Sequence, residues 1–448
     1  MRFSALSLGL VALAVLASVA AACSSDSPTP SDTPAPEFTP LPPDEQRIVY
    51  VSDDLAIFTI RLDGTRRQRI IGGGSGSGGG IQARPLQQDA ASPSYTWPTW
   101  APDGSQLAVS RSPGPTTGSV ASLTLLSPPG INERFVHETG PGLVSLVADG
   151  APHYVQWSPD GQHLAFIAPN REGTALALYE TAAAGESEEY DLVLLTQSAP
   201  IYFAWSPDST RLLIHRREEL FLQREDGSLE NLRRDSFSYR VPAFSRDSGS
   251  IAYIADTGRG EHLTVREVAT GNENELMPVP FDGAFAWSPT DSGLLAGTRR
   301  TDPRGGGYDG LSLFDTRTGE SRRVYEGEVG AFYWSPDGTK LAMATTRPRS
   351  QLFQWTIVDA ESGASSVVAT FTPSRTFLAH LQFFDQFAPS HGIWSVDSRY
   401  IVSSGRVAVD GVLRRGPNRV WLVDTTGESA PLALAEGSLG FFVPAGAS

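Results

Sequence analysis

A short motif recurs along this chain and limits what the chain can fold into. In its fullest form the motif reads "WSPDGTKLAMA", which is an aromatic residue followed by Ser-Pro-Asp-Gly and then by a short apolar run. Copies follow one another at intervals of about 40 to 60 residues, the length of one supersecondary unit in a repeat protein. The clear copies begin at Thr99, Trp157, Trp205, Phe244, Trp287, Trp334 and Trp394, and a degenerate copy occupies residues 41–52.

The residue types of the motif predict a turn between two strands. Proline fixes φ, and the oxygen atoms of Asp or Ser accept hydrogen bonds from nearby backbone N–H groups. Glycine supplies the positive φ that closes such a hairpin. Six of the nine Trp residues occupy the aromatic position, where a large flat side chain can fill the wedge between neighbouring units. We therefore interpret the motif as structural and expect no ligand-binding role for Trp334, Pro336, Asp337 or Gly338.

Each copy of the motif is followed by a strand pattern that ends in a second turn, as in "LSLFDTRTGE", and then by two further short strand patterns. Four short strands with turns at regular intervals are typical of one blade of a β-propeller. The turn aspartates of this second element allow two interpretations, hairpin turns or metal ligands. We favour hairpin turns, because successive blades would spread these side chains around a rim. They are Asp63, Asp226, Asp315, Asp359 and Asp424.

The sequence thus predicts an all-β fold, a single closed β-propeller of four-stranded blades over residues 41–448. Counting the copies gives eight blades, and seven is the alternative if residues 41–70 form an irregular arm. The C-terminal stretch "SLGFFVPAG", residues 438–446, resembles a strand that leads into a Trp. We expect this C-terminal strand to complete the first blade, because ring closure removes exposed sheet edges.

These repeats resemble the WD40-like repeats of the TolB propeller family, over about nine-tenths of the chain. The resemblance implies a propeller fold and says almost nothing about activity. A similar propeller precedes the hydrolase domain of prolyl-oligopeptidase-like enzymes. The G-x-S-x-G motif of a nucleophilic serine does not occur in this sequence.

The N-terminus predicts export. Arg2 is followed by an almost unbroken run of small and apolar residues, so we interpret residues 1–22 as a signal peptide. The run ends in "SVAAAC", which resembles the bacterial lipobox, in which the cysteine becomes the first mature residue and carries the lipid. Cys23 is the only cysteine of the chain, so it has no partner for an internal disulfide. The prediction is an extracytoplasmic protein held on a bacterial membrane by lipid on Cys23; an ordinary signal peptide is the alternative.

Composition adds two expectations. Residues 23–40 are rich in Pro, Ser and Thr and cannot bury apolar surface, so they predict a disordered tether. The formal net charge of −15 argues against a nucleic-acid partner, because binding to phosphates requires concentrated Lys and Arg.

The long insertions all fall between the second and third strands of a blade or between blades. These connections lie on one face of a propeller, which we call the loop-bearing face, and the tight turns lie on the other. Elaboration of one face alone indicates that function resides there. The insertions are residues 71–96, 112–122, 137–152, 299–310 and 371–392.

The insertion 371–392 predicts a short amphipathic helix over the mouth of the central channel. We expect it to bury Phe377, Leu381 and Phe384 and to present its polar side chains. A structural plug is the favoured interpretation, and a binding site is the alternative. The spacing of the His and Asp residues matches no strong metal pattern, so we predict neither a metal nor a cofactor. The candidate binding residues are Arg375, His380, Asp385, Gln386 and His391.

Two functions remain open from the sequence. One is a non-enzymatic cell-surface lipoprotein that binds a protein, peptide or glycan on the loop-bearing face. The other is an extracytoplasmic hydrolase or lyase whose polar residues converge in the channel from several blades. Convergence of such side chains beneath the 371–392 insertion would favour the enzyme, and a dry channel filled with Phe would count against it.

Overall fold

The computed structural model describes residues 46–72, 94–112, 122–127, 132–138, 152–170, 175–182, 191–224, 226–236, 240–346 and 352–444. The chain divides into two compact units, Met1–Glu37 and Phe38–Ser448, and every described residue belongs to the second. The predicted signal peptide, Cys23 and the tether therefore lie outside the described residues, as do most of the insertions 71–96, 112–122 and 137–152.

Five of the sheets in the described part of the chain have four antiparallel strands each. The first sheet contains β1 (Arg47–Val51), β2 (Ile57–Arg61), β3 (Gln68–Ile71) and β30 (Leu439–Phe442). The second contains β4 (Ser94–Trp100), β5 (Leu107–Ser112), β6 (Ser122–Ser127) and β7 (Asn132–Glu138). The third contains β8 (His153–Trp157), β9 (His163–Pro169), β10 (Leu176–Ala182) and β11 (Val193–Gln197). The fourth contains β12 (Ile201–Trp205), β13 (Leu212–Arg216), β14 (Glu219–Gln223) and β15 (Leu229–Arg233), and the fifth β16 (Ala243–Phe244), β17 (Ser250–Asp256), β18 (Glu261–Glu267) and β19 (Glu273–Pro278).

A sixth sheet has ten strands in sequence order. Its long strands β23 and β26 each pair with the preceding strand near one end and with the following strand near the other. Beside β27, an isolated bridge joins Trp394 to Ile401, at the place of an innermost strand. The strands are β20 (Asp282–Trp287), β21 (Leu294–Arg300), β22 (Tyr308–Asp315), β23 (Ser321–Trp334), β24 (Lys340–Thr346), β25 (Phe353–Asp359), β26 (Ser365–Pro373), β27 (Tyr400–Val407), β28 (Arg419–Asp424) and β29 (Leu432–Glu436).

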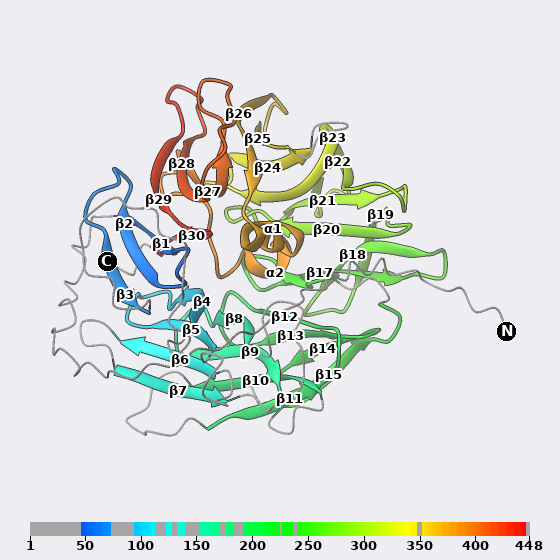
Figure 1. The fold of residues 1–448 in the computed structure, drawn as a ribbon. Coiled ribbons are helices and arrows are strands. Elements are labelled where there is room, and N and C mark those ends of the chain that lie inside the picture. The colour runs from blue at the N-terminus through cyan, green and yellow to red at the C-terminus, as the bar shows by residue number, and fades with distance from the viewer. Residues whose placement is uncertain are drawn as a thin grey trace. The chain divides into compact units, whose positions relative to one another are not determined.

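The sheets stand side by side around a common centre (Figure 1), which is the arrangement of a β-propeller. Innermost strands of neighbouring sheets contact one another, for example β4 with β8 and β12 with β16. The predicted all-β class and the antiparallel four-stranded unit are confirmed. The C-terminal strand β30 pairs with β1, with Phe442 opposite Ile48 and Leu439 opposite Val51.

Two short helices, α1 (Arg375–Gln382) and α2 (Phe384–Phe387), lie at the centre of the sheets (Figure 1). Helix α1 contacts β23, β26 and β27, whereas α2 contacts β12 and β20. In the part of the chain that the structure describes, no helix has both the length and the apolar character needed to cross a membrane.

Burial falls from the centre of the propeller outwards. All residues of the inner strands β1, β8 and β30 are buried, whereas most residues of the outer strands β11, β19 and β29 are exposed or only partly buried. The apolar run after each motif forms the second strand of a sheet, which is covered on both faces by its neighbours.

The Ser-Pro-Asp-Gly segments form the predicted turns. In the copy at Trp334, the Ser335 hydroxyl donates to Asp337 Oδ1 at 2.6 Å and accepts the N–H of Lys340 at 2.9 Å. Gly338 has φ 71° and donates its N–H to the carbonyl of Ser335. Where Ser replaces this Gly, the residue keeps the positive φ, and its hydroxyl accepts an N–H from the neighbouring turn, as Ser398 does from Asp337 at 3.2 Å.

The turn aspartates of the second element cap their own hairpins, which agrees with the hairpin interpretation. Asp63 Oδ1, for example, accepts the N–H of Thr65 at 2.8 Å and the Thr65 hydroxyl at 2.6 Å. Equivalent bonds hold the turns at Asp226, Asp315, Asp359 and Asp424.

The Trp residues of the motif link successive copies of the motif by hydrogen bonds. Each indole Nε1–H donates to the carbonyl of the residue that precedes the aromatic position of the copy before it, so the link requires Trp and not merely an apolar ring. Two sites differ: Phe244 has no N–H to donate, and the buried Nε1 of Trp100 has no partner among the residues that the structure describes. The links run from Trp157 to Thr99 at 3.0 Å, Trp205 to Gln156 at 3.4 Å, Trp287 to Ala243 at 3.1 Å, Trp334 to Ala286 at 3.1 Å and Trp394 to Tyr333 at 3.1 Å.

The substitution Trp334→Phe removes one of these links while keeping an aromatic ring in the wedge. We expect the free energy of unfolding to fall by about 1 kcal/mol beyond the loss of ring area, because the Ala286 carbonyl loses its donor. Urea denaturation measures the change. Trp100→Phe is the matched control, because it removes the same ring area but no hydrogen bond. Equal losses in the two variants would show that the indole bond is not the source of the stability.

Candidate functional site

The central helices begin at Ser374, which caps α1. The Ser374 side chain accepts the N–H of Phe377 at 3.0 Å and donates to the carbonyl of Ser438, next to β30. An extended residue with a short hydroxyl side chain is a strong helix start. One residue thus fixes the beginning of α1 and ties it to the C-terminal strand.

Aromatic packing holds the helices in the channel. Phe377, Leu381 and Phe384 are buried, as predicted. Phe387, at the end of α2, stacks on Trp97 with ring centroids 4.3 Å apart and an interplanar angle of 4°. The rings of Phe332 and Phe384 lie 5.0 Å apart. This part of the channel is therefore filled with aromatic side chains, which is the arrangement of a plug.

The two histidines of the insertion are buried, so the prediction that they are presented at the surface is wrong. His380 stacks between the rings of Tyr333 and Phe377, and its Nδ1 lies 3.2 Å from the Tyr333 hydroxyl. His391 lies between two hydroxyls, with Nδ1 2.7 Å from Ser390 Oγ and Nε2 3.3 Å from Thr99 Oγ1. The two side chains are buried because a neutral imidazole is a flat ring that packs well within an aromatic cluster.

Burial lowers the pKa of both imidazoles. The pKa of His391 falls to about 3, and the pKa of His380 falls well below its usual value, with the proximity of His391 as a second cause. Both rings are therefore neutral at physiological pH and serve as packing and hydrogen-bonding groups.

Asp385 belongs to a separate polar cluster. Its side chain is only 7 % exposed, and Oδ2 lies 3.6 Å from Nη1 of Arg240. Arg240 makes two short bonds to Asp282, at 2.9 and 2.7 Å, and also donates to the Tyr308 hydroxyl. Burial is the main cause that raises the pKa of Asp385, and the charge of Arg240 acts against it. The carboxylate is therefore close to a guanidinium but not hydrogen-bonded to it.

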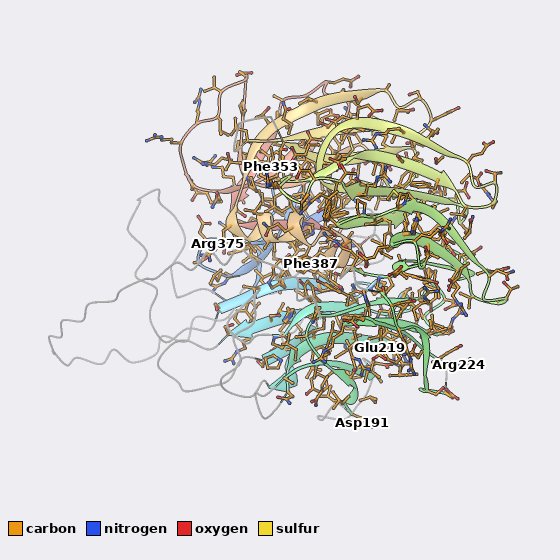
Figure 2. All side chains as sticks on the ribbon, turned by 90° about the vertical axis from the view of Figure 1, so that its right-hand side faces the viewer. Asp191, Glu219, Arg224, Phe353, Arg375 and Phe387 are labelled. Carbon is orange, nitrogen blue, oxygen red and sulfur yellow. The ribbon has the colours of Figure 1, made fainter. Side chains whose placement is uncertain are left out.

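The other two candidate residues lie apart from this cluster. Gln386 is buried, and its backbone carbonyl accepts an N–H from the Gln156 side chain at 3.0 Å. Among the described residues, its own side-chain nitrogen and oxygen have no partner. Arg375 is exposed at the start of α1 (Figure 2).

The structure thus places the five predicted residues in four different surroundings, with Gln386 buried apart from the others, and does not assemble them into one site. The histidines pack in the aromatic cluster, Asp385 faces Arg240, and Arg375 faces solvent. No group of three His, Cys, Asp or Glu side chains in the described ranges is placed to hold a metal ion.

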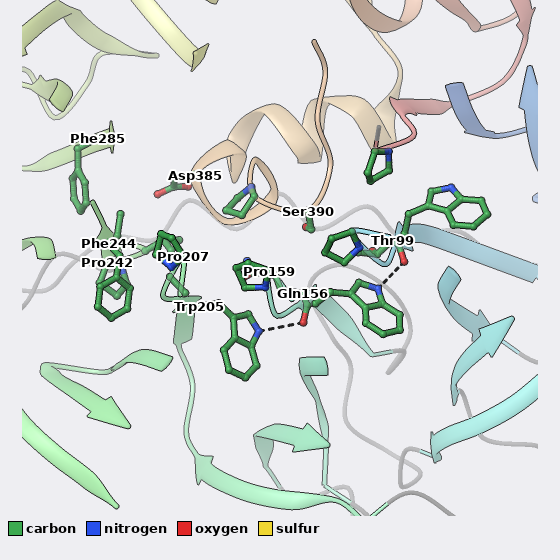
Figure 3. A pocket seen from close by; sticks show the side chains of 18 residues that line it. Thr99, Gln156, Pro159, Trp205, Pro207, Pro242, Phe244, Phe285, Asp385 and Ser390 are labelled. Atoms are coloured by element: carbon green, nitrogen blue, oxygen red, sulfur yellow. Dashed lines mark hydrogen bonds between the residues drawn. The ribbon is translucent and has the colours of Figure 1, made fainter. Parts of the chain in front are cut away.

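A cavity of about 550 Å³ lies beside α2 (Figure 3). Its walls include Pro102, Pro159 and Pro207, which belong to the tight turns, so the cavity lies at the end of the channel opposite the loop-bearing face. Asp385 is the one charged side chain among the described residues that line it. The lining residues are Thr99, Trp100, Pro102, Gln156, Trp157, Pro159, Ala204, Trp205, Pro207, Val241, Pro242, Ala243, Phe244, Phe285, Asp385, Pro389, Ser390 and Pro444.

Sequence reasoning missed this cavity and the partners of Asp385. One feature of the sequence could have indicated both. In the copy of the motif at Phe244, "RVPAF" departs from the pattern, because a Phe stands in place of the Trp. The corresponding inner strand β16 is only two residues long. The shortened strand leaves Arg240 outside the sheet, from where it reaches Asp282 and Asp385.

The chain matches no protein-family model and no curated protein. It is similar to the structure of dihydro-heme d1 dehydrogenase NirN, with a TM-score of 0.51 and 14% identity over 93% of this chain and 78% of that one. It is also similar to a prolyl endopeptidase, with a TM-score of 0.51 and 10% identity over 79% of this chain and 50% of that one. At these identities the likeness establishes the fold alone.

A further match is TolB from Acinetobacter baumannii, with 17% identity over 73% of this chain and 79% of that one. Its TM-score of 0.38 is too low for the match to bear on the fold of this chain. The fold therefore stands on the sheet topology and on the two closer structural matches.

The buried imidazole of His391 predicts a dependence of stability on pH. Its pKa is lowered on folding from 6.5 to about 3, so its contribution is fully present above pH 6.5 and is lost as the pH falls towards 3. Between pH 7 and pH 5 we expect the wild-type protein to lose about 2 kcal/mol more than His391→Gln, in which an uncharged side chain keeps hydrogen-bonding capacity.

Urea denaturation at a series of pH values provides the comparison. The raised pKa of Asp385 contributes with the opposite sign, and it cancels because both proteins carry that residue. Between pH 7 and pH 8 the two proteins should change in parallel. Identical losses on acidification would contradict a neutral, buried His391.

Proposed function

We propose that this chain is a non-enzymatic, extracytoplasmic lipoprotein whose propeller binds a protein, peptide or glycan in the central cavity. The observation that carries the proposal is the open cavity beside α2, walled by Trp, Pro and Phe side chains. Concave apolar surfaces with a few polar groups are the usual sites of ligand binding. Most residues of the insertions 71–96, 112–122 and 137–152, which the sequence predicts on the loop-bearing face, lie outside the described residues.

The surroundings of the polar groups favour binding over catalysis. His391 and Ser390 are hydrogen-bonded to each other, and His380 is stacked between aromatic rings. Arg240 is engaged by Asp282. These groups hold the plug and the inner strands together, which is the role that the plug interpretation assigns to them.

A panel of peptides and oligosaccharides tests this function. We expect at least one member to change the Trp fluorescence of the purified protein, because Trp100, Trp157 and Trp205 line the cavity, and to be recovered intact by mass spectrometry. Ala204→Phe places a ring in the cavity and should abolish binding while leaving the melting temperature nearly unchanged. Cleavage of a panel member would support the alternative, a hydrolase or lyase. Unchanged binding by Ala204→Phe would remove the cavity as the site.

We also propose that the propeller has eight blades, with β30 completing the first. Five blades correspond to the four-stranded sheets. In the ten-stranded sheet, β23 pairs with β22 over residues 321–329 and with β24 over residues 329–334, so it serves two successive blades. The bridge of Trp394 to Ile401 supplies the inner edge of the last blade. The pairing of β30 with β1 supports closure of the ring.

The membrane anchor has its own test. We expect Cys23→Ala to release the protein from the membrane fraction, because the proposed lipid is attached to that sulfur, whereas the wild type stays bound. Fractionation of cells with immunoblotting measures the distribution, and Ser24→Ala is the matched control beside the same cleavage site. Membrane association that persists in Cys23→Ala would overturn the lipid anchor.

A further inference from the structure

Most of the described hydrogen-bond donors around the cavity are engaged within the protein, and the Nε1 of Trp100, which has no partner among the described residues, is buried. The indoles of Trp157 and Trp205 donate to the carbonyls of Thr99 and Gln156, as the dashed lines in Figure 3 show. The Gln156 side chain donates to the carbonyl of Gln386 at 3.0 Å. The described walls therefore offer a ligand few N–H or O–H groups.

The two hydroxyl groups near the end of α2 are also hydrogen-bonded within the protein. The hydroxyl of Ser390 lies 2.7 Å from Nδ1 of His391, and the hydroxyl of Thr99 lies 3.3 Å from Nε2 of the same ring. Both hydroxyls belong to residues that line the cavity, and both are within hydrogen-bonding distance of His391. We therefore assign neither hydroxyl a role in holding a bound molecule.

The acceptors, in contrast, are only partly used. Asp385 Oδ1 accepts a single backbone N–H at 3.2 Å, from Gln386. Oδ2 lies 3.6 Å from Arg240, beyond hydrogen-bonding distance, because Asp282 holds the guanidinium by two shorter bonds. A carboxylate accepts up to four hydrogen bonds, so Asp385 keeps acceptor capacity towards the cavity.

A second acceptor belongs to Ala204, another residue of the cavity lining. The carbonyl of Ala204 is at the position that takes an indole N–H in the neighbouring sheets, but the residue across from it is Phe244. Phenylalanine supplies a ring face and no donor. Both residues line the cavity.

Charge and ring faces favour a cation in this place. Aromatic faces attract positive charge, and the cavity has three indoles and two Phe rings in its walls. The formal net charge of −15 raises the local concentration of cations around the whole chain. A ligand with a positively charged hydrogen-bond donor at one end and an apolar stem would match the free acceptor, the aromatic rings and the apolar walls of the cavity.

We infer that the cavity binds a primary alkylammonium group, which donates to Asp385 while its aliphatic stem packs against the Trp and Pro walls. This inference rests on the proposed binding function and names the chemistry that the site selects. A lysine side chain of a peptide and a free alkylamine share that chemistry.

Titration of the purified protein with small probes, followed by Trp fluorescence, tests the inference. The probes are N-acetyl-lysine methylamide, the same compound with a methyl group in place of the ammonium, and butylammonium. We expect the lysine compound to bind at least about tenfold more tightly than its uncharged match. Tighter binding of the lysine compound than of butylammonium identifies a peptide as the source, and the reverse order identifies a free amine; either order satisfies the inference.

Two variants locate the charge. Asp385→Asn should weaken the lysine compound about tenfold and leave the uncharged compound unchanged. Asp302→Asn is the matched control, because it removes one carboxylate charge from an exposed turn that does not line the cavity, and it should change the affinity less than about twofold. If Asp385→Asn does not fold, the comparison of the charged and uncharged probes on the wild-type protein decides the question.

Equal affinity for the charged and uncharged probes, or unchanged affinity in Asp385→Asn, overturns the inference. The proposed function fails differently. If a panel ligand binds and Ala204→Phe blocks it while no ammonium probe binds, the cavity is a binding site of another selectivity. If no panel ligand binds but the lysine probe does, the ammonium site stands and the macromolecular ligand does not.

Discussion

The indole hydrogen bond between successive copies of the motif is the interaction on which this propeller depends. The inner strands of successive copies share no backbone ladder with one another, so side chains must hold them in register. A Trp fills the wedge between two copies and also fixes their relative position, because its Nε1 reaches a single carbonyl of the preceding copy. The two aromatic positions without this bond, Trp100 and Phe244, both line the cavity. The cavity is thus lined both by indoles that make the bond, Trp157 and Trp205, and by the two aromatic residues that lack it.

The repeat determined how much of the fold could be predicted. A motif with Pro at a fixed φ, Gly at a positive φ and a Trp before them specifies its turn locally, so the strands and turns followed from the sequence. The long strands β23 and β26, which serve two neighbouring groups of strands each, were not predicted, because strand pairing beyond a hairpin depends on contacts between distant residues. The insertion was predicted as an amphipathic helix with the correct buried face, yet the burial of His380 and His391 was not. The helix pattern alone does not show that aromatic residues of the strands, such as Tyr333, pack against the side of the helix that carries His380.

At the candidate site, too, local features could be predicted from the sequence and contacts between distant residues could not. Asp385 was a candidate because of its residue type, but its partner Arg240 lies in a segment with no motif, 145 residues earlier in the chain. No spacing rule connects the two positions, and only the closed arrangement of the strands brings them together. The helices fill the channel from the loop-bearing side and leave the other end open, with Asp385 at the boundary between the dry cluster and the cavity. Its raised pKa reflects that boundary, since burial opposes the charge more than Arg240 supports it.

The pairing of β30 with β1 has a consequence for the order of events in the cell. Val51 and Leu439 are paired neighbours although 387 residues separate them in the chain. During synthesis β1 emerges before β30 and has no partner on that side until β30 has been made. Contacts between residues so far apart in sequence slow folding, because the intervening chain must be ordered or closed into a loop before they form. Until β30 pairs with β1, the inner edge of the first sheet stays exposed, and the pairing covers it.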